Sequence, residues 1–261
     1  MHFRFGIFAL VSFSFVTNIR AADVGDPIRS TLIKNARVEL IYEKYDRDVK
    51  FSNAQFTAAG PGGVFPFTHP GHSASQKEDR LMARFGFPVG NTVILQLDAG
   101  VTDSEESEDL VGILGGGIRV HAYESDTVDA SIFALAHYVP EIEYKWSTTD
   151  STLGRAFSTQ EESYWEASGG FLLSRAFALE KESTLTPYGG IMISVFQGDE
   201  DWTALYPDTG LIEKGSGDLE GDGVFSVLGG LAFMFNPALS VRVEGRFVNQ
   251  TSISAALAMS F

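Results

Sequence analysis

The sequence contains no cysteine among its 261 residues. This absence excludes disulfide scaffolds, thiolate metal sites and lipid modification of an N-terminal cysteine. No stretch reaches the roughly 20 apolar residues that a helix needs to cross a membrane, so the helix-bundle class of membrane proteins is excluded. Basic residues are few, because 19 Lys and Arg stand against 34 Asp and Glu, which leaves a net charge of −15. Such a chain does not bind nucleic acid or anionic lipid through bulk charge.

The first residues have the pattern of a secretory signal peptide. His2 and Arg4 precede an apolar stretch from Phe5 to Val16, and Arg20-Ala21-Ala22 follows it. A stretch of about a dozen apolar residues is too short to span a bilayer as a helix and suits a cleaved leader. We therefore predict that residues 1–22 are a signal peptide and that residues 23–261 form one exported domain. Export without cysteine suits the envelope of a Gram-negative bacterium.

Segments in which apolar and polar residues alternate recur from residue 36 onward, and this period of two is typical of strands whose faces meet different surroundings. The expected strands are 36–45, 79–87, 93–101, 110–122, 130–146, 162–178, 185–197, 223–235, 239–247 and 252–261. Long connections at one end alternate with tight turns at the other. The sequence therefore predicts an all-β fold, a single antiparallel up-and-down transmembrane β-barrel of about ten strands, and eight or twelve strands also fit the pattern.

The long connections are expected to be loops. Residues 46–78 contain Gly60-Pro61-Gly62-Gly63, Pro66 and Pro70-Gly71, and proline and glycine at that density do not maintain a ladder. The acidic clusters at 103–109, 161–162, 199–201 and 218–222 are expected to lie in loops as well. Within the strand 162–178, Arg175 falls on the apolar side, which indicates a bulge or a strand end there.

The segment from Ser252 to Phe261 places large apolar or small residues on odd positions and Ser or Ala on even ones. This ending resembles the closing strand of bacterial outer-membrane β-barrels, whose final aromatic residue is read by the assembly machinery. The chain as a whole resembles the small porin-like and OmpA-like barrel proteins in its architecture and in this ending. The resemblance implies an outer-membrane location, contact with lipid and lipopolysaccharide, and recognition of Phe261 by the barrel assembly machinery.

The polar positions of the strands carry mixed charges. They are Arg37, Glu39, Arg80, Arg84, Asp98, Arg119, Arg242, Glu244 and Arg246. An arginine facing midplane lipid costs about 2–4 kcal/mol, so in a membrane barrel this face is the inner one. The lumen of a ten-stranded barrel is narrow, and we expect these side chains to leave it mostly plugged, with at best a narrow path. Two interpretations stay open, a structural ion-pair network and a charged constriction that selects solutes.

Aromatic residues near the expected strand ends suggest interface girdles on the apolar face. They are Tyr144, Trp146, Trp165 and Phe261. The Gly115-Gly116-Gly117 run would weaken an ordinary strand, but in a barrel glycines relieve crowding where the sheet curves.

Residues that carry catalytic or metal chemistry give weak signals. His69 and His72 lack a positioned third ligand, so we expect no metal and no cofactor. His121 and His137, which share the inward parity, offer a base beside Asp129, although an interior histidine bonded to a carboxylate is the commoner arrangement. The outer-membrane proteases of the omptin family share the strand number, but no motif of theirs is present. The acidic clusters offer oxygen ligands for divalent cations shared with lipopolysaccharide phosphates, or else are solvated loops.

Taken together, these features predict an outer-membrane β-barrel protein with a structural, surface-interaction or narrow-pore role and no catalysis. Two alternatives belong to other classes. One is an outer-membrane hydrolase that uses His and Asp residues of the rim or the lumen. The other is a secreted soluble barrel that binds an apolar ligand inside.

Overall fold

The computed structural model describes residues 35–68, 72–104, 107, 109–125, 127–150, 153–179, 182–221, 225–248 and 250–261. The predicted signal peptide lies outside them. The described strands are β1 (Arg37–Gly60), β2 (Gly63–Thr68), β3 (His72–Val89), β4 (Val93–Ser104), β5 (Val111–Glu124), β6 (Asp129–Asp150), β7 (Gly154–Ser174), β8 (Phe177–Ala178), β9 (Thr184–Tyr206), β10 (Leu211–Gly221), β11 (Phe225–Asn236), β12 (Leu239–Val248) and β13 (Gln250–Ser260). No helix among these residues is long and apolar enough to span a bilayer.

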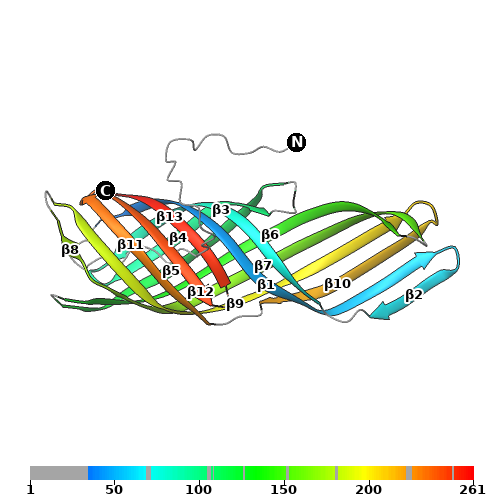
Figure 1. Ribbon diagram of the computed structural model, residues 1–261, viewed down its shortest axis with the longest axis horizontal. Coiled ribbons are helices and arrows are strands. Elements are labelled where there is room, and N and C mark those ends of the chain that lie inside the picture. The colour runs from blue at the N-terminus through cyan, green and yellow to red at the C-terminus, as the bar shows by residue number, and fades with distance from the viewer. Residues whose placement is uncertain are drawn as a thin grey trace.

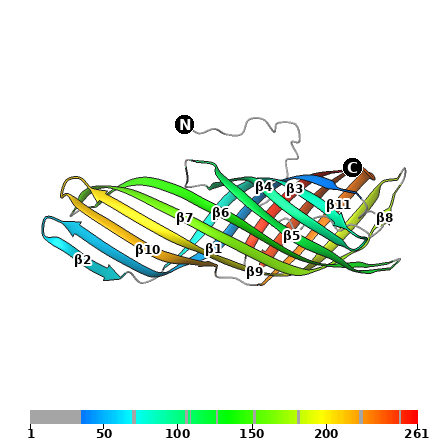
Figure 2. The ribbon, with the colours of Figure 1, turned by 180° about the vertical axis from the view of Figure 1, so that it is seen from behind.

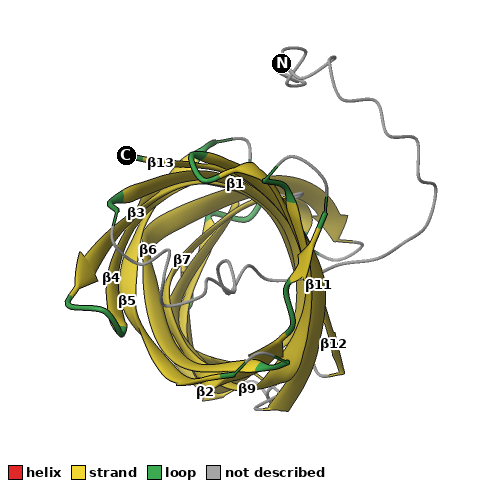
Figure 3. Cartoon of the chain, turned by 90° about the vertical axis from the view of Figure 1, so that its left-hand side faces the viewer, coloured by secondary structure: helices red, strands yellow, loops and turns green. Residues whose placement is uncertain are grey.

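The strands form one antiparallel sheet that closes on itself. β1 pairs with β13 on one side and with β3 on the other, and this double pairing completes a ring of ten strands in the order β1-β3-β4-β5-β6-β7-β9-β11-β12-β13. Figure 3 shows this ring end-on. The predicted antiparallel up-and-down barrel and its ten strands are therefore confirmed, and β2, β8 and β10 lie outside the ring.

The two ends of the barrel differ in length. Tight turns join β3 to β4 and β11 to β12, the latter closed by a bond from the Ala238 amide to Asn236 Oδ1 at 2.8 Å. At the other end the sheet continues well past the ring, where β10 pairs with both β9 and β1 (Figures 1 and 2). We call this part the extension: residues 48–60 of β1, β2, 141–150 of β6, 154–163 of β7, 197–206 of β9, and β10.

The prediction of long loops at this end is wrong for three of the four long connections. Residues 46–60 continue β1, residues 147–159 belong mostly to β6 and β7, and residues 198–221 form most of the β9–β10 hairpin. Within the predicted loop 46–78, Pro61 and Gly62 make the turn between β1 and β2, so they do not interrupt a ladder. Pro66 lies in β2, for which the described part of the chain supplies one partner strand, β1. Proline is tolerated in such an edge strand because no partner needs its missing N–H.

The acidic clusters are also mostly in strands rather than in loops. Glu161 and Glu162 lie in β7, residues 199–201 lie in β9, and residues 218–221 end β10. Asp103 lies near the end of β4, while residues 105, 106, 108 and 222 fall outside the described part of the chain. By contrast, the strand end expected at Arg175 is confirmed, because β7 ends at Ser174.

Within the ring, side chains alternate between an apolar outer face and a mostly polar inner face. On β4 the exposed residues Leu95, Leu97 and Ala99 alternate with the buried Gln96 and Asp98. On β13, Leu257 and Met259 are exposed, whereas Ser252, Ser254, Ala256 and Ala258 are buried. This order is the reverse of the one in a soluble barrel, where burial favours apolar side chains.

A bulge in β6 overturns one prediction about faces. The pairing of β6 with β7 shifts register between Val139 and Ile142, so the residues beyond it change sides. Ile142 and Tyr144 therefore point inward and are buried, and Tyr144 is only 7% exposed. Its predicted place in an interface girdle is wrong, while Trp146, Trp165 and Phe261 are exposed.

Glycines make room for large inward side chains of neighbouring strands. A Cβ atom on Gly115 of β5 would lie 2.2 Å from Cδ2 of His137, and one on Gly230 of β11 would lie 2.4 Å from the hydroxyl of Tyr188. The predicted role of the Gly115-Gly116-Gly117 run in relieving crowding is therefore supported by a specific contact, since His137 lies over Gly115.

Candidate functional site

The sequence-predicted charged residues all lie on the inner face of the barrel wall. Eight of them are buried: Glu39, Arg80, Arg84, Asp98, Arg119, Arg242, Glu244 and Arg246. The ninth, Arg37, is partly buried, and its Nε lies 2.9 Å from Glu39 Oε1. The structure does not bring the nine together in one site; it divides them among several groups along the lumen.

One group lies toward the tight-turn end. Glu39 of β1 accepts a bond from Nη2 of Arg242 on β12 at 3.0 Å in addition to its contact with Arg37. Arg37 also donates to Ser240 Oγ at 3.0 Å, and so links β1 to β12 across β13. Two further residues have neutral partners: Arg119 donates to Ser131, and Glu244 accepts from the hydroxyl of Tyr188 at 2.8 Å. These contacts satisfy charges that would otherwise be costly inside the wall.

A second group surrounds Asp98 of β4. Its two carboxylate oxygens accept bonds from Nε and Nη2 of Arg84 at 2.8 and 2.7 Å, which is the two-point geometry that guanidinium and carboxylate groups favour. Nε2 of His137 on β6 lies 2.7 Å from Asp98 Oδ2, and its Nδ1 lies 3.5 Å from Glu166 Oε1. His137 thus joins the Asp98 group to a larger cluster.

That larger cluster, which we call the central cluster, consists of Arg47, Glu78, Arg80, Tyr164 and Glu166. Glu166 Oε2 accepts a bond from Nη1 of Arg47 at 3.1 Å, and Glu166 Oε1 accepts one from Nη1 of Arg80 at 2.5 Å. Glu78 pairs with Nη2 of both arginines, at 3.2 Å for Arg47 and 3.0 Å for Arg80. The Tyr164 hydroxyl donates to Glu78 at 2.7 Å.

The central cluster crosses the lumen. Arg47 lies on β1 and Glu166 on β7, and the ring order β1-β3-β4-β5-β6-β7 places these strands five steps apart in a ring of ten. They are therefore opposite walls of the barrel. A direct bond between opposite walls means that side chains fill the section at this level, as expected for a barrel of this width.

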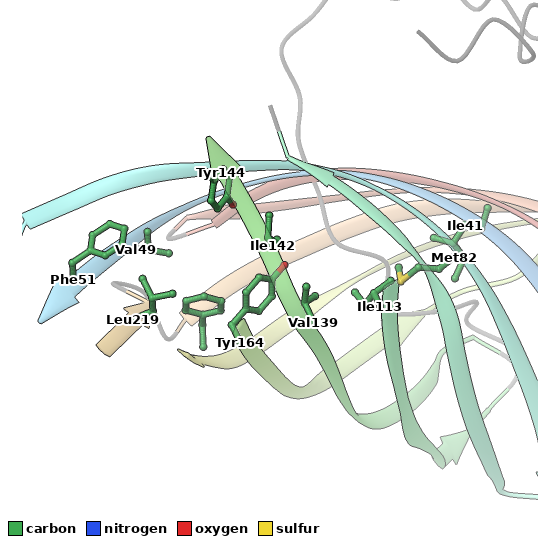
Figure 4. Close-up of a cluster of buried hydrophobic side chains, with 12 residues drawn as sticks. Ile41, Val49, Phe51, Met82, Ile113, Val139, Ile142, Tyr144, Tyr164 and Leu219 are labelled. Carbon is green, nitrogen blue, oxygen red and sulfur yellow. The ribbon is translucent and has the colours of Figure 1, made fainter. Parts of the chain in front are cut away.

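Aromatic and aliphatic side chains complete the barrier. The guanidinium of Arg47 lies 3.6 Å from the ring centroid of Phe196 and 4.4 Å from that of Tyr164, distances at which a cation is attracted to an aromatic face. The two rings lie 4.9 Å apart. Tyr164 belongs to a buried apolar cluster with Val139, Ile142 and others drawn from several strands (Figure 4).

Sequence reasoning missed Arg47, Glu78, Tyr164 and Glu166 as site residues. Arg47 and Glu78 fell inside the predicted loop 46–78, and Glu166 lay on the inner parity of a predicted strand without being singled out. The available signal was the period of two in Glu39, Ile41, Glu43, Tyr45 and Arg47, which continues inward without a break past the expected strand end.

Two strands of the wall between β1 and β9, β11 and β13, carry small inward side chains. Ser226, Ser252 and Ser254 on β11 and β13 are buried, and their hydroxyls have no hydrogen-bond partner among the described residues. Buried hydroxyls need partners, and water is the usual one where protein atoms do not supply them.

Two carboxylates face inward where the barrel gives way to the extension. Glu162 of β7 and Glu200 of β9 are register partners, and burial together with the neighbouring Glu200 raises the pKa of Glu162 to about 7. Burial and the adjacent Asp201 raise the pKa of Glu200 to about 7 as well. Glu162 also accepts bonds from Gln76 at 3.1 Å and Gln160 at 2.6 Å.

The commoner arrangement expected from the sequence, an interior histidine bonded to a carboxylate, is found at His137. His137 has Asp98 and Glu166 as carboxylate partners, while Asp129 lies at the start of β6, and His121 Nε2 lies 3.7 Å from Glu124 Oε2. His69 and the side chain of His72 fall outside the described residues. In the part of the chain that the structure describes, no group of three or more His, Asp or Glu side chains is placed to hold a metal ion.

No protein-family model matches the sequence, and no curated protein matches it either. Among solved structures, the chain is similar to the translocator domain of the autotransporter NalP from Neisseria meningitidis, with 8% identity, coverage of 86% of this chain and 88% of that one, and a TM-score of 0.39. The β domain of the Bordetella autotransporter BrkA has 10% identity, coverage of 86% and 99%, and a TM-score of 0.37. The Pseudomonas putida toluene transporter TodX has 12% identity, coverage of 90% and 70%, and a TM-score of 0.36.

The geometry itself defines the fold class. A closed ring of antiparallel strands in up-and-down order, tight turns at one end, long hairpins at the other, an apolar exterior and a charged interior occur together in this chain. The chain has the architecture of the bacterial outer-membrane β-barrels.

Proposed function

We propose that this protein is an outer-membrane β-barrel whose lumen is closed and whose role is carried by the extension, as a surface for interaction outside the membrane. Catalysis has no part in this proposal. The observation that carries it is the bond between opposite walls, Arg47 to Glu166, reinforced by Arg80 and Glu78. A barrel filled in this way offers its outer end, rather than a conduit, for function.

The membrane location is supported by the reversed order of its faces. The exposed apolar side chains of the ring, such as Leu97, Ile193 and Val243, form an outer surface that only lipid or another apolar phase covers favourably. In this location lipid and lipopolysaccharide surround the ring. Heat-modifiable migration on a gel and extraction only with detergent are the expected results. Extraction in aqueous buffer without detergent would favour the soluble ligand-binding barrel instead.

Conductance of the refolded chain in a planar bilayer tests whether the lumen is closed. We expect a silent bilayer for the native chain, because the central cluster fills the section. Glu166→Ala removes the carboxylate that both Arg47 and Arg80 bind, and is expected to produce discrete conductance steps. Glu220→Ala, on the exposed face of β10, is the matched control and stays silent. Steps of equal size from the native chain would overturn the closed-lumen proposal.

A narrow polar path is the second candidate function, and the wall of β11–β13 favours it. The partnerless hydroxyls of Ser226, Ser252 and Ser254 need water, and Arg246 lies on β12 between the two strands that carry them. If such a path conducts in the native chain, Ser254→Val should block it, and Arg246→Gln should change its ion selectivity. Absence of both effects would leave the path without function.

The hydrolase alternative rests on His137, and its surroundings speak for a structural role. Both oxygens of Asp98 bind Arg84, and Glu166 binds two arginines, so neither carboxylate is left to serve a substrate. We propose that His137 is a member of the network. An esterase or protease activity that is lost in His137→Ala would contradict this assignment.

We also propose that the C-terminal strand is the segment that the barrel assembly machinery recognises. Phe261 lies on the same exposed face of the C-terminal strand as Leu257 and Met259, and its amide donates to the carbonyl of Ala36 at 2.9 Å. Phe261→Ala is expected to lower the amount of protein assembled in cells while leaving refolding in detergent unchanged. Met259→Ala is the matched control for loss of apolar surface. Equal assembly of the Phe261 variant and the native chain would contradict the proposal.

A further inference from the structure

An exposed apolar row crosses the extension near its tip. The register pairs Phe157 of β7 with Leu205 of β9, Leu205 with Ile212 of β10, Ile212 with Ala59 of β1, and Ala59 with Val64 of β2. Directly paired residues of antiparallel strands project from the same face, so these five side chains form one line. Phe157, Leu205, Ile212 and Val64 are 47%, 42%, 39% and 66% exposed. With strands about 4.8 Å apart, the line is roughly 19 Å long.

The apolar row is separated from the outer surface of the ring. Leu205 follows Val195, the last exposed aliphatic residue of β9 in the ring, by ten positions, which at about 3.4 Å per residue places it about 34 Å farther along the strand. The outward residues between them on this strand are Gln197, Asp199, Asp201 and Thr203. Lipid that covers the ring therefore does not reach the row.

Acidic residues form two lines on the same face, between the apolar row and the ring. Glu161 is paired with Asp201, and Asp199 is paired with Asp218. Glu143 of β6 extends the first line, because it is paired with Glu161. A line that contains Thr159, Thr203 and Lys214 lies between these acids and the apolar row. Since same-face residues repeat about every 7 Å along a strand, the first acidic line runs about 14 Å from the apolar row.

We propose that this face of the extension binds a basic polypeptide, one that presents an apolar row beside a line of lysine or arginine side chains. The inference rests on the proposed function and names the class of partner for it. Charge complementarity selects this partner: the two acidic lines attract cations and raise the association rate, and the apolar row supplies the contact area. A second copy of the chain is disfavoured, because it would bring acidic lines against acidic lines.

The spacing of the two features defines what the partner must carry. A polypeptide that lies along the strands contacts the apolar row and reaches Glu161 and Asp201 about 14 Å away, a distance that four residues of an extended chain span. In an extended chain residues i and i+4 lie on the same face, so the partner needs an apolar residue at one position and a lysine or arginine four positions along. Arg155, Lys145 and Lys214 also lie on this outer face, and Lys145 Nζ lies 2.5 Å from Glu143 Oε2. The attraction for a basic partner therefore rests on Glu161, Asp201 and Asp199.

The test uses a synthetic peptide, the leucine–lysine peptide, in which leucine and lysine stand four positions apart with serine at the positions between them. Its binding to the refolded chain is measured in zwitterionic lipid nanodiscs, with empty nanodiscs subtracted. Leucine–glutamate and serine–lysine peptides control for apolar contact and for charge. We expect the leucine–lysine peptide to bind at least about tenfold more tightly than either control, a difference of about 1.4 kcal/mol. The binding should weaken with added salt, because exposed charges are screened.

Variants assign the binding to the face. Leu205→Ser with Ile212→Ser, and separately Glu161→Gln with Asp201→Asn, are each expected to weaken binding at least about tenfold. Phe65→Ser removes an equally exposed apolar side chain from the opposite face of β2 and should leave binding unchanged. If the leucine–lysine peptide does not bind while the conductance test of the native chain stays silent, this inference is overturned but the closed-lumen proposal stands. Attachment of lipopolysaccharide through Ca²⁺, with loss only in the Glu161 and Asp201 variants, would also overturn it, since the apolar row would then have no part.

Discussion

Both carboxylate oxygens of Asp98 accept bonds from the guanidinium of Arg84, at 2.8 and 2.7 Å, inside a wall where both side chains are buried. The pair joins β3 to β4, and His137 Nε2 adds a third contact at 2.7 Å. A buried ion pair stabilises little relative to apolar residues, but the loss of one partner leaves the other charge uncompensated.

We therefore expect Asp98→Ala to destabilise the barrel by about 3–5 kcal/mol. Replacing both residues, Arg84→Met with Asp98→Leu, should restore much of that loss, because neither member of the pair is then left buried without the other and His137 keeps Glu166 as a carboxylate partner. Urea unfolding in detergent micelles, followed by tryptophan fluorescence, measures both effects. Asp103→Ala, an exposed acid of the same strand, is the control and should change little. A double variant as unstable as Asp98→Ala would show that the pair itself, rather than the orphaned charge, sets the cost.

Gly215 of β10 is required by an aromatic ring on the neighbouring strand. A Cβ atom there would lie 2.4 Å from Cδ1 and from Cε1 of Phe56, whose ring packs edge-on against Trp202 at 5.5 Å. Gly215→Ala is expected to displace this ring and to destabilise the extension by about 1–3 kcal/mol. Trp202 fluorescence, recorded with Trp146 and Trp165 replaced by phenylalanine, reports the change.

Two comparisons show whether the aromatic ring of Phe56 is the cause. Gly112→Ala places a methyl group where no atom lies within 4 Å, so it should be neutral. The loss caused by Gly215→Ala should be smaller in a Phe56→Ala background, since the clash is then removed. Equal losses in both backgrounds would assign the effect to the backbone of β10 instead.

Stability should fall as the pH rises through the range in which Glu162 and Glu200 ionise. Their pKa values are raised to about 7 in the folded chain, above the ordinary value of 4.5, so the folded state binds more protons than the unfolded state between those limits. The slope of unfolding free energy with pH is then negative: the stabilising effect of the protonated forms is complete below pH 4.5 and is lost as the pH rises through about 7.

The Glu162→Gln and Glu200→Gln double variant should remove this contribution. The gain in urea midpoint over the native chain is expected to be larger at about pH 8 than at about pH 5. One pKa unit corresponds to about 1.4 kcal/mol, which is an upper limit per unit here because water reaches Glu200. Parallel pH profiles for the native chain and the variant would contradict the raised pKa values.

Sequence periodicity was sufficient to predict the strands of the ring because the two faces of these strands meet different surroundings. The alternation of Ser254, Ala256 and Ala258 with Leu257 and Met259 leaves one register for β13. The extension carries no such contrast, since both of its faces include polar residues. Its strands therefore looked like loops.

Two features of the site also lay beyond sequence reasoning. The bulge at Pro140 reverses the parity of β6 within one strand, and periodicity alone does not reveal where such a reversal occurs. The bond between Arg47 and Glu166 depends on β1 and β7 being opposite walls, which follows only from the closed ring. The sequence indicated that charges face inward, but not which of them meet.

The orientation of the barrel can be read from the two kinds of turn. Thr209 lies in the exposed turn between β9 and β10, at the tip of the extension, and Asn91 lies in the exposed turn between β3 and β4, at the other end. Because the chain has no cysteine, a single Thr209→Cys or Asn91→Cys substitution gives one reactive thiol. Longer connections of outer-membrane barrels face outward and short turns face the periplasm.

A membrane-impermeant maleimide should therefore label Thr209→Cys in intact cells and label Asn91→Cys only after the outer membrane is opened. Labelling of both in intact cells would contradict membrane insertion, and labelling of Asn91→Cys alone would reverse the orientation and put the acidic face out of reach of any partner outside the cell.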